Sequence, residues 1–156
     1  MYQMNGNGRA TWLIIADSSS CKIYEYVKTR SEIHLIKELL HPENQLKDSD
    51  YMSDKQGSFR SRGGSGGHGT FLANADPKKT KVEQFSKEIA NLLEHDRKTN
   101  CYEHLILISP PHMNGLLHQA FSKHVLKKLD LSIDKSVVNY PRQKLLSFVH
   151  QYTHIH

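Results

Sequence analysis

Two short continuous apolar runs constrain the fold of this chain more than any other feature. They are WLIIA at residues 12–16 and LILI at residues 105–108, and neither contains a polar side chain. Apolar side chains at every position indicate a strand that is covered on both faces, as in sheets with helices on either side. We therefore expect these two segments to be central, adjacent strands of one sheet.

The chain before residue 41 favours a three-stranded antiparallel meander. The segment CKIYEYV at 21–27 follows a serine-rich turn and partly alternates, which predicts a half-exposed strand that forms a hairpin with the first one. The segment EIHLIKELL at 32–40 does not separate apolar from polar positions cleanly, but its place after a short polar turn favours a third strand. His41-Pro42 ends it, because proline has no N–H for a sheet ladder.

Helical spacing returns after a long polar stretch. Apolar side chains recur on one face from Val82 to Leu93 and predict a helix over about 80–99, with Pro77 just before it and Asn100 able to stop it. The elements expected after this helix are a strand in 104–111, one helix over 114–128, a strand at 131–138 and a last helix from 141.

This order, β-β-β-loop-α-β-α-β-α, predicts an α/β fold. Three strands joined by short turns are antiparallel, whereas strands reached through helices run parallel to a neighbour with right-handed crossovers. We expect a single domain over residues 1–156 with a mixed five-stranded sheet, covering helices and a ribonuclease-H-like architecture. A long basic glycine-rich loop at about 43–80 interrupts it.

The loop contains most of the chain's excess charge. Between Asp54 and Lys81 there are six basic and two acidic residues, a net +4 of the chain's total of +5. In its middle, RGGSGGHG at 62–69 has five glycines. Because phosphate contacts are short-range and screened by salt, such a local excess says more about a partner than the overall charge does.

Three interpretations of this segment are open: a linker, a phosphate cradle, or a tip presented to a partner. A cradle is disfavoured because no strand precedes Gly63 and no Gly-Lys-Ser or Gly-Lys-Thr occurs. Arginines can bind phosphate through two hydrogen bonds, and Phe59 and Phe71 could stack on unpaired bases. These features favour contact with RNA or the ribosome over a loop that only adds solubility. The residues expected to bind RNA are Arg60, Arg62, Gly63, Gly64, Gly66, Gly67, His68, Lys78, Lys79 and Lys81.

Other chemistry finds little support in the sequence. Asp17 ends the first central strand, but the second ends in Ser-Pro-Pro, so the several carboxylates of a two-metal nuclease are missing and Asp17 is expected to bond its own turn. Cys21 and Cys101 are expected to be free thiols rather than a disulfide or metal ligands. We expect no metal and no cofactor, and a binding module rather than an enzyme, with His68 the one catalytic candidate.

The length of the apolar runs and the composition of the first residues bear on where the protein is located in the cell. None approaches the roughly 20 residues that span a bilayer. The start, MYQMNGNGRA, lacks the basic and apolar regions of a secretory signal. We therefore expect a cytoplasmic protein without a membrane span.

Four segments resemble one bacterial family: WLIIADSSSCKIYEY, HPENQLKDSDYMSDKQGSF, LILISPPHMNGLL and IDKSVVNYP. The family is that of the host attachment proteins, described as required for attachment to host cells, and the resemblance covers about residues 11–149. This family in turn looks like the middle domain of eukaryotic and archaeal class I peptide-release factors. There a basic loop with a Gly-Gly-Gln tip precedes a long helix, and SFRSRGGSGGHGTF has the same place here.

The resemblance implies a ribonuclease-H-like fold and a role near the ribosome's peptidyl-transferase centre. The chain departs from the family tip, because Ser65 follows Gly63-Gly64 and His68 follows Gly66-Gly67 where the release factors have glutamine. Three functions remain open. They are an RNA- or ribosome-associated binding module, a release-factor-like hydrolase of the peptidyl-tRNA ester, and an interaction protein that promotes attachment to host cells.

Overall fold

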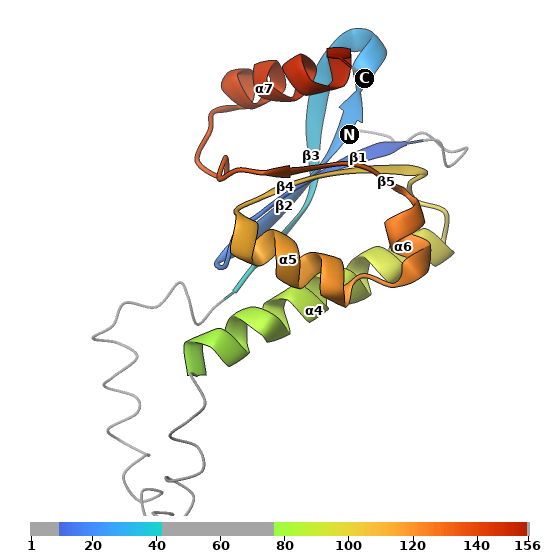
Figure 1. Cartoon of the computed structure of the whole chain (residues 1–156). Helices are drawn as coiled ribbons and strands as arrows, with labels where there is room; N and C mark the ends of the chain where they lie inside the picture. The colour runs from blue at the N-terminus through green and yellow to red at the C-terminus, as the bar shows by residue number, and fades with distance from the viewer. Residues whose placement is uncertain (1–9, 42–76, 156) are drawn as a thin grey trace, which may run out of the picture.

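The structure, a computed structural model, describes residues 10–41 and 77–155, and a five-stranded mixed sheet forms its centre (Figure 1). The strands are β1 (Thr11–Ala16), β2 (Ser20–Val27), β3 (Glu32–Leu40), β4 (His104–Ser109) and β5 (Leu129–Asp134). The helices are α4 (Pro77–Lys98), α5 (Pro111–Ala120), α6 (Lys123–Lys127) and α7 (Arg142–Ile155), and a 3₁₀ turn, η1 (Lys28–Arg30), joins β2 to β3.

The two apolar runs are the central pair of the sheet. The strand order is β3-β2-β1-β4-β5, and β1 pairs with β4 in parallel, with Leu13 opposite Ile106. Only β2 is antiparallel to its neighbours, so β1, β3, β4 and β5 share one direction. The predicted α/β fold, a ribonuclease-H-like sheet of a three-stranded meander and two further parallel strands, is confirmed.

Helices cover both faces of the sheet. In Figure 1, α4, α5 and α6 lie on one face and α7 lies on the other. Alternate β1 side chains follow this division: Trp12 and Ile14 belong to the core under α4 and α5, whereas Leu13 and Ile15 belong to the core under α7. All four are at most 1% exposed, which explains why the run has no polar position.

A β-bulge explains the irregular pattern of β3. Tyr24 pairs with Leu35, but the preceding residue, Ile23, pairs with Lys37, so Ile36 is an extra residue in β3. A bulge reverses the in–out alternation of the residues beyond it. Lys37 consequently lies on the same face as Ile23, towards α4, and the strand shows no clean alternation in sequence.

α4 begins at Pro77, a little earlier than expected, so the last residues of the expected 43–80 loop form its first turn. Proline is common at this position because the N–H it lacks would have no helical partner. At the other end Asn100 adopts a left-handed φ of 59°. Its N–H donates to the Arg97 carbonyl at 3.0 Å, and the Cys101 N–H donates to the Asp96 carbonyl at 2.9 Å, the Schellman pattern. Asn100 as the stop is confirmed.

The single helix expected over 114–128 is wrong, because two helices, α5 and α6, occupy this stretch. Phe121 leaves the helical region with ψ of 140°, and Ser122 becomes the N-cap of α6, its Oγ accepting from the Val125 N–H at 3.1 Å. The same hydroxyl donates to Glu94 Oε1 of α4 at 2.9 Å. The cap and this contact compensate for the interrupted helix.

The last strand also lies earlier than expected. β5 ends at Asp134, and Val137, predicted to lie in the strand, packs against the α7-side core from the following loop, with 2% of its surface exposed. The Tyr140 N–H donates to the Val137 carbonyl at 3.0 Å and closes a turn there. A loop residue buried against the core is apolar just as a buried strand residue is, so the sequence alone does not distinguish the two.

Candidate functional site

The carboxyl ends of the parallel strands form one edge of the sheet. We call it the carboxyl edge, and it contains Asp17 after β1, His41 after β3, and the paired strand ends Ser109 of β4 and Asp134 of β5. In open α/β sheets, ligands bind outside the carboxyl ends of the strands. The chain leaves the described region from this edge after residue 41, which makes the edge the candidate functional site.

His41 ties the edge to the long helix. Its backbone N–H donates to the Ser19 carbonyl at 3.0 Å, and its ring stacks on the Phe85 ring of α4, with centroids 5.0 Å apart. Both side chains are buried. The stacking fixes the end of β3 against the N-terminal half of α4, the helix that begins at Pro77.

Asp17 organises the turn between β1 and β2. Its Oδ1 accepts hydrogen bonds from the N–H groups of Ser19 and Ser20, both at 2.9 Å, and from the Ser19 hydroxyl at 3.1 Å. The expectation that Asp17 bonds its own turn is confirmed. Within residues 10–41 and 77–155, no three His, Cys, Asp or Glu side chains gather closely enough to hold a metal ion.

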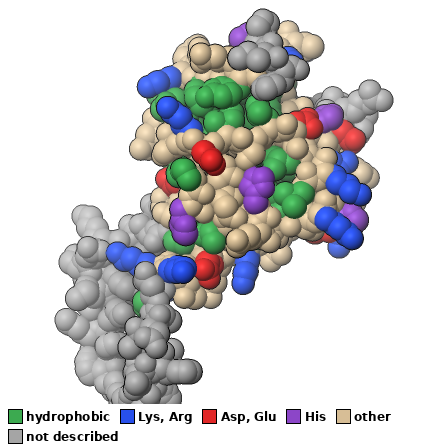
Figure 2. Space-filling model, viewed as in Figure 1, with side chains coloured by type: hydrophobic (Ala, Val, Ile, Leu, Met, Phe, Trp, Pro, Cys, Tyr) green, Lys and Arg blue, Asp and Glu red, His purple; other side chains and the backbone are tan. Residues whose placement is uncertain are grey.

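The first turn of α4 is basic. Lys78 and Lys79 are exposed, Lys81 is half-buried, and this turn contains no acidic residue. Helices usually place acids there, because the unpaired N–H groups make the N-terminus equivalent to about half a positive charge. Figure 2 shows Lys and Arg side chains beside the start of α4, next to the residues drawn in grey. The lysines and the helix end therefore add their positive potentials.

The structure describes only part of the set predicted to bind RNA. The three lysines lie together in the first turn and a half of α4, as above. Arg60, Arg62, Gly63, Gly64, Gly66, Gly67 and the catalytic candidate His68 lie outside the described residues.

A serine–histidine pair on the α5 side resembles a catalytic dyad, but here the histidine donates its hydrogen bond to the serine instead of accepting one from it. His118 Nε2 lies 3.0 Å from Ser132 Oγ, and Ser132 Oγ lies 3.1 Å from Asn114 Oδ1. An amide oxygen only accepts, so the serine hydroxyl donates to Asn114 and the histidine donates to the serine. His118 is therefore not placed as a general base, and the buried Asn114 serves to link α5 to β5.

Both cysteines are free thiols, as expected. Cys21 is fully buried, and burial, with a smaller contribution from the Asp17 carboxylate, raises the pKa of its thiol. A protonated, inaccessible thiol is a poor nucleophile. Cys101 is partly exposed beyond α4, with its Sγ 3.3 Å from Thr99 Oγ1.

Sequence reasoning missed a cleft at the opposite, amino edge of the sheet. Its volume is about 480 Å³, and its polar lining comes from Thr11, Tyr26, Lys28, Asp130 and Thr153. The lining residues come from four strands, the 3₁₀ turn and the last helix, so no local motif joins them. A signal that could have raised the question is the acid at position 130 between two leucines of a strand.

The fold is an α/β domain with a mixed five-stranded sheet, and the basic start of α4 lies at its carboxyl edge, where open α/β sheets bind ligands. The chain belongs to the family described as "Protein required for attachment to host cells", whose family model matches residues 12–149. The family expected from the sequence is thus confirmed. No match was found among curated proteins.

Solved structures include similar chains at low identity. An archaeal translation termination factor, aRF1, is 11% identical with a TM-score of 0.47, over 95% of this chain and 39% of that one. A second structure, titled "Archaeal protein", is 11% identical with a TM-score of 0.45, over 96% of this chain and 42% of that one. The chain therefore spans about two fifths of their length. In the part of the chain that the structure describes, no helix combines the length and apolarity needed to cross a bilayer.

Proposed function

We propose that this protein is a binding module for RNA, on or off the ribosome, which it contacts with the basic glycine-rich segment and the start of α4. The observation that carries the proposal is the basic first turn of α4 at the carboxyl edge. Lys78, Lys79 and Lys81 add to the positive helix end, and the first turn contains no acidic residue. A polyanion is the partner that such a potential attracts.

The placement of these lysines works against helix stability, which supports a functional reason for it. A cation in the first turn of a helix is disfavoured by roughly 0.3–1 kcal/mol, the reverse of the gain that an acid would give. The sequence before the helix adds the same kind of charge, with Arg60 and Arg62 beside a run of glycines. Arginine grips phosphate through two parallel hydrogen bonds, and glycines allow close backbone approach.

A salt titration with a matched control tests the proposal. Binding of a single-stranded RNA oligonucleotide is measured from low to high salt for the wild type and for Lys78→Gln/Lys79→Gln. The control, Lys123→Gln/Lys127→Gln, removes two exposed lysines from α6 at the amino edge. We expect the α4 variant to bind more weakly and to lose about 0.7 from the salt slope per phosphate contact removed, and the control to match the wild type.

Two results would refute RNA binding at this edge. One is the absence of wild-type affinity for RNA and for purified ribosomes even at low salt. The other is an equal loss in both double variants, because net charge alone would then explain the binding. An added His68→Ala variant, assayed for peptidyl-tRNA hydrolysis, tests whether the tip is chemically active.

Attachment to host cells is a second candidate, favoured by the family description. A direct role requires the protein outside the cell, whereas an RNA-binding role makes any attachment effect indirect. Attachment of a deletion strain is measured after purified protein is added to the medium, and after the wild type or Lys78→Gln/Lys79→Gln is expressed inside the cell. Restored attachment with added protein supports a direct role. Restored attachment with the expressed wild type, but not with the expressed variant, supports a role through RNA.

A further inference from the structure

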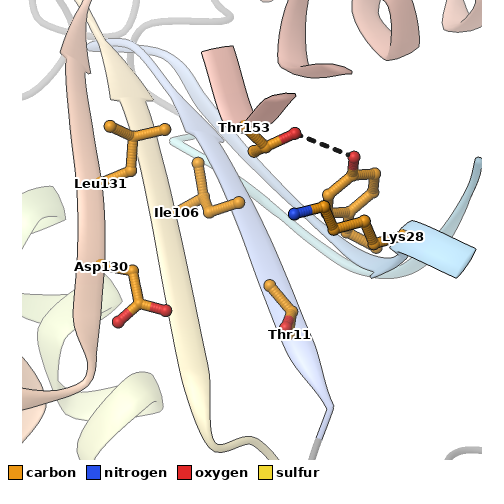
Figure 3. A pocket seen from close by; sticks show the side chains of 7 residues that line it. Thr11, Lys28, Ile106, Asp130, Leu131 and Thr153 are labelled. Atoms are coloured by element: carbon orange, nitrogen blue, oxygen red, sulfur yellow. Dashed lines mark hydrogen bonds between the residues drawn. The ribbon is translucent and has the colours of Figure 1, made fainter. Parts of the chain in front are cut away.

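The cleft at the amino edge is a second potential site, separate from the carboxyl edge. It lies on the face that α7 covers, where Thr11 of β1, Ile106 of β4 and Leu131 of β5 line it (Figure 3). A volume of about 480 Å³ corresponds to about fifteen water molecules and falls within the usual range of small-molecule pockets. The cleft is therefore large enough for a small metabolite.

A register shift directs an acid into this cleft. Leu105 pairs with Leu129, but the next residue of β4, Ile106, pairs with Leu131, so Asp130 is an extra residue in β5. Leu129 packs towards α4 and α5, whereas Leu131 packs towards α7. Two residues of a regular strand that are two positions apart would share a face. The shift thus accounts for Asp130 and Leu131 both lining the cleft.

A neighbouring histidine holds the Asp130 carboxylate. His104 Nδ1, at the start of β4, lies 2.8 Å from Asp130 Oδ2. Within the described residues, Oδ1 of the same carboxylate has no hydrogen-bond or ion-pair partner. One oxygen is therefore fixed by the protein and the other can accept from a ligand.

Lys28 provides a cation on the other side of the cleft. It begins the 3₁₀ turn after β2, it is exposed, and its ammonium has no ion-pair partner among the described residues. Beside it, the Tyr26 hydroxyl lies 3.1 Å from Thr153 Oγ1, a bond that joins the end of β2 to the end of α7. Figure 3 shows Lys28 on the right and Asp130 on the left, with the apolar side chain of Ile106 between them.

We propose that this cleft binds a free α-amino acid with an apolar side chain. The ligand's ammonium group would donate to Asp130, its carboxylate would face Lys28, and its side chain would lie on Ile106 and Leu131. A molecule with a single charge would leave one of the two lining charges unmatched, whereas a zwitterion satisfies both. The inference does not depend on RNA binding, because the cleft and the basic start of α4 lie at opposite edges of the sheet.

Ligand titration of the full chain, followed by amide chemical shifts, tests the proposal. L-leucine is compared with two analogues that each lack one charge, isoamylamine and 4-methylpentanoate. We expect leucine to shift the amides of Ile106 and Leu131 saturably, with a dissociation constant of about 1 mM or tighter. Each analogue should bind about threefold to fivefold more weakly, the loss typical of one exposed charge pair.

Matched variants assign the charges. Asp130→Asn and Lys28→Met should each weaken leucine binding by about threefold to fivefold. Asp134→Asn, at the far end of the same strand, and Lys123→Met, on α6, should leave it unchanged. No saturable shift, or equal binding of leucine and both analogues, overturns the proposal. The analogue comparison uses wild-type protein, so it decides the question even where a variant fails to fold, and RNA affinity measured in parallel separates its outcome from that of the proposed function.

Discussion

The ion pair between Lys37 and Asp96 provides the sharpest test of how the sheet holds α4. The Lys37 ammonium donates to Asp96 Oδ2, and Asp96 Oδ1 lies 3.1 Å from His95 Nδ1. The Asp96 side chain is only 4% exposed, whereas the Lys37 side chain is 38% exposed. Removing the lysine therefore leaves a buried charge, whereas removing the carboxylate leaves a charge that water can reach, so we expect different losses of stability.

Lys37→Met removes the ammonium, which also lies 5.7 Å from the centroid of the Trp12 ring. It leaves a buried carboxylate whose remaining side-chain partner among the described residues is the exposed His95. Breaking a buried pair from one side typically costs about 3–5 kcal/mol, and the partial exposure of this pair places the expected cost near 3 kcal/mol. Asp96→Asn instead leaves a lysine that water can hydrate, so we expect a cost of about 1 kcal/mol.

Urea unfolding followed by the fluorescence of Trp12, the chain's only tryptophan, measures both free energies. Lys98→Met is the control, because Lys98 is 66% exposed and 3.9 Å from Glu94. We expect a change below about 0.5 kcal/mol for it. If Lys37→Met costs no more than Asp96→Asn, the reasoning from unequal burial is wrong.

Three further outcomes are expected. Iodoacetamide should modify Cys101 in the folded protein but reach Cys21 only after unfolding, which mass spectrometry of the labelled peptides decides. Tyr102→Phe should cost about 1–2 kcal/mol in urea unfolding, because the Tyr102 hydroxyl donates to the buried Leu93 carbonyl at 2.7 Å; an unchanged midpoint would contradict this. Hydrogen bonds from Arg97, the larger effect, and from Ser122 lower the pKa of the Glu94 carboxyl from 4.5 to about 2. The stabilising contribution of the Glu94 carboxylate is therefore complete above pH 4.5 and is lost as the pH falls towards 2. Acid unfolding of Glu94→Gln should lack this component, and an acid limb identical to that of the wild type would count against the interaction.

The sequence was sufficient for the centre of the fold because burial there is complete. A strand covered on both faces has to be apolar at every position, so the runs that contain Leu13 and Ile106 identified the central parallel pair. Asp17 was equally predictable, because a short acid after a strand bonds the N–H groups of its own turn.

Elements that depend on a single extra residue or a local break could not be predicted. The extra residues Ile36 and Asp130 alter which side chains share a face of the sheet. No pattern in the amino-acid sequence indicates where the strand register shifts. The break at Ser122 is hidden because Leu117, Phe121 and Val125 keep helical spacing and all enter the same core. Periodicity reports which face is buried, not whether the backbone is continuous.

The anchoring of residue 41 beside α4, the helix that begins at residue 77, has a consequence for engineering. His41 is fixed against Phe85, so the chain leaves and re-enters the fold beside the same helix. Doubling the length of a flexible connection between anchored ends costs only about 0.6 kcal/mol in closure entropy. We therefore expect the five strands to keep their pairing when foreign peptides of different lengths are grafted between residues 41 and 77, which would make the domain a display scaffold.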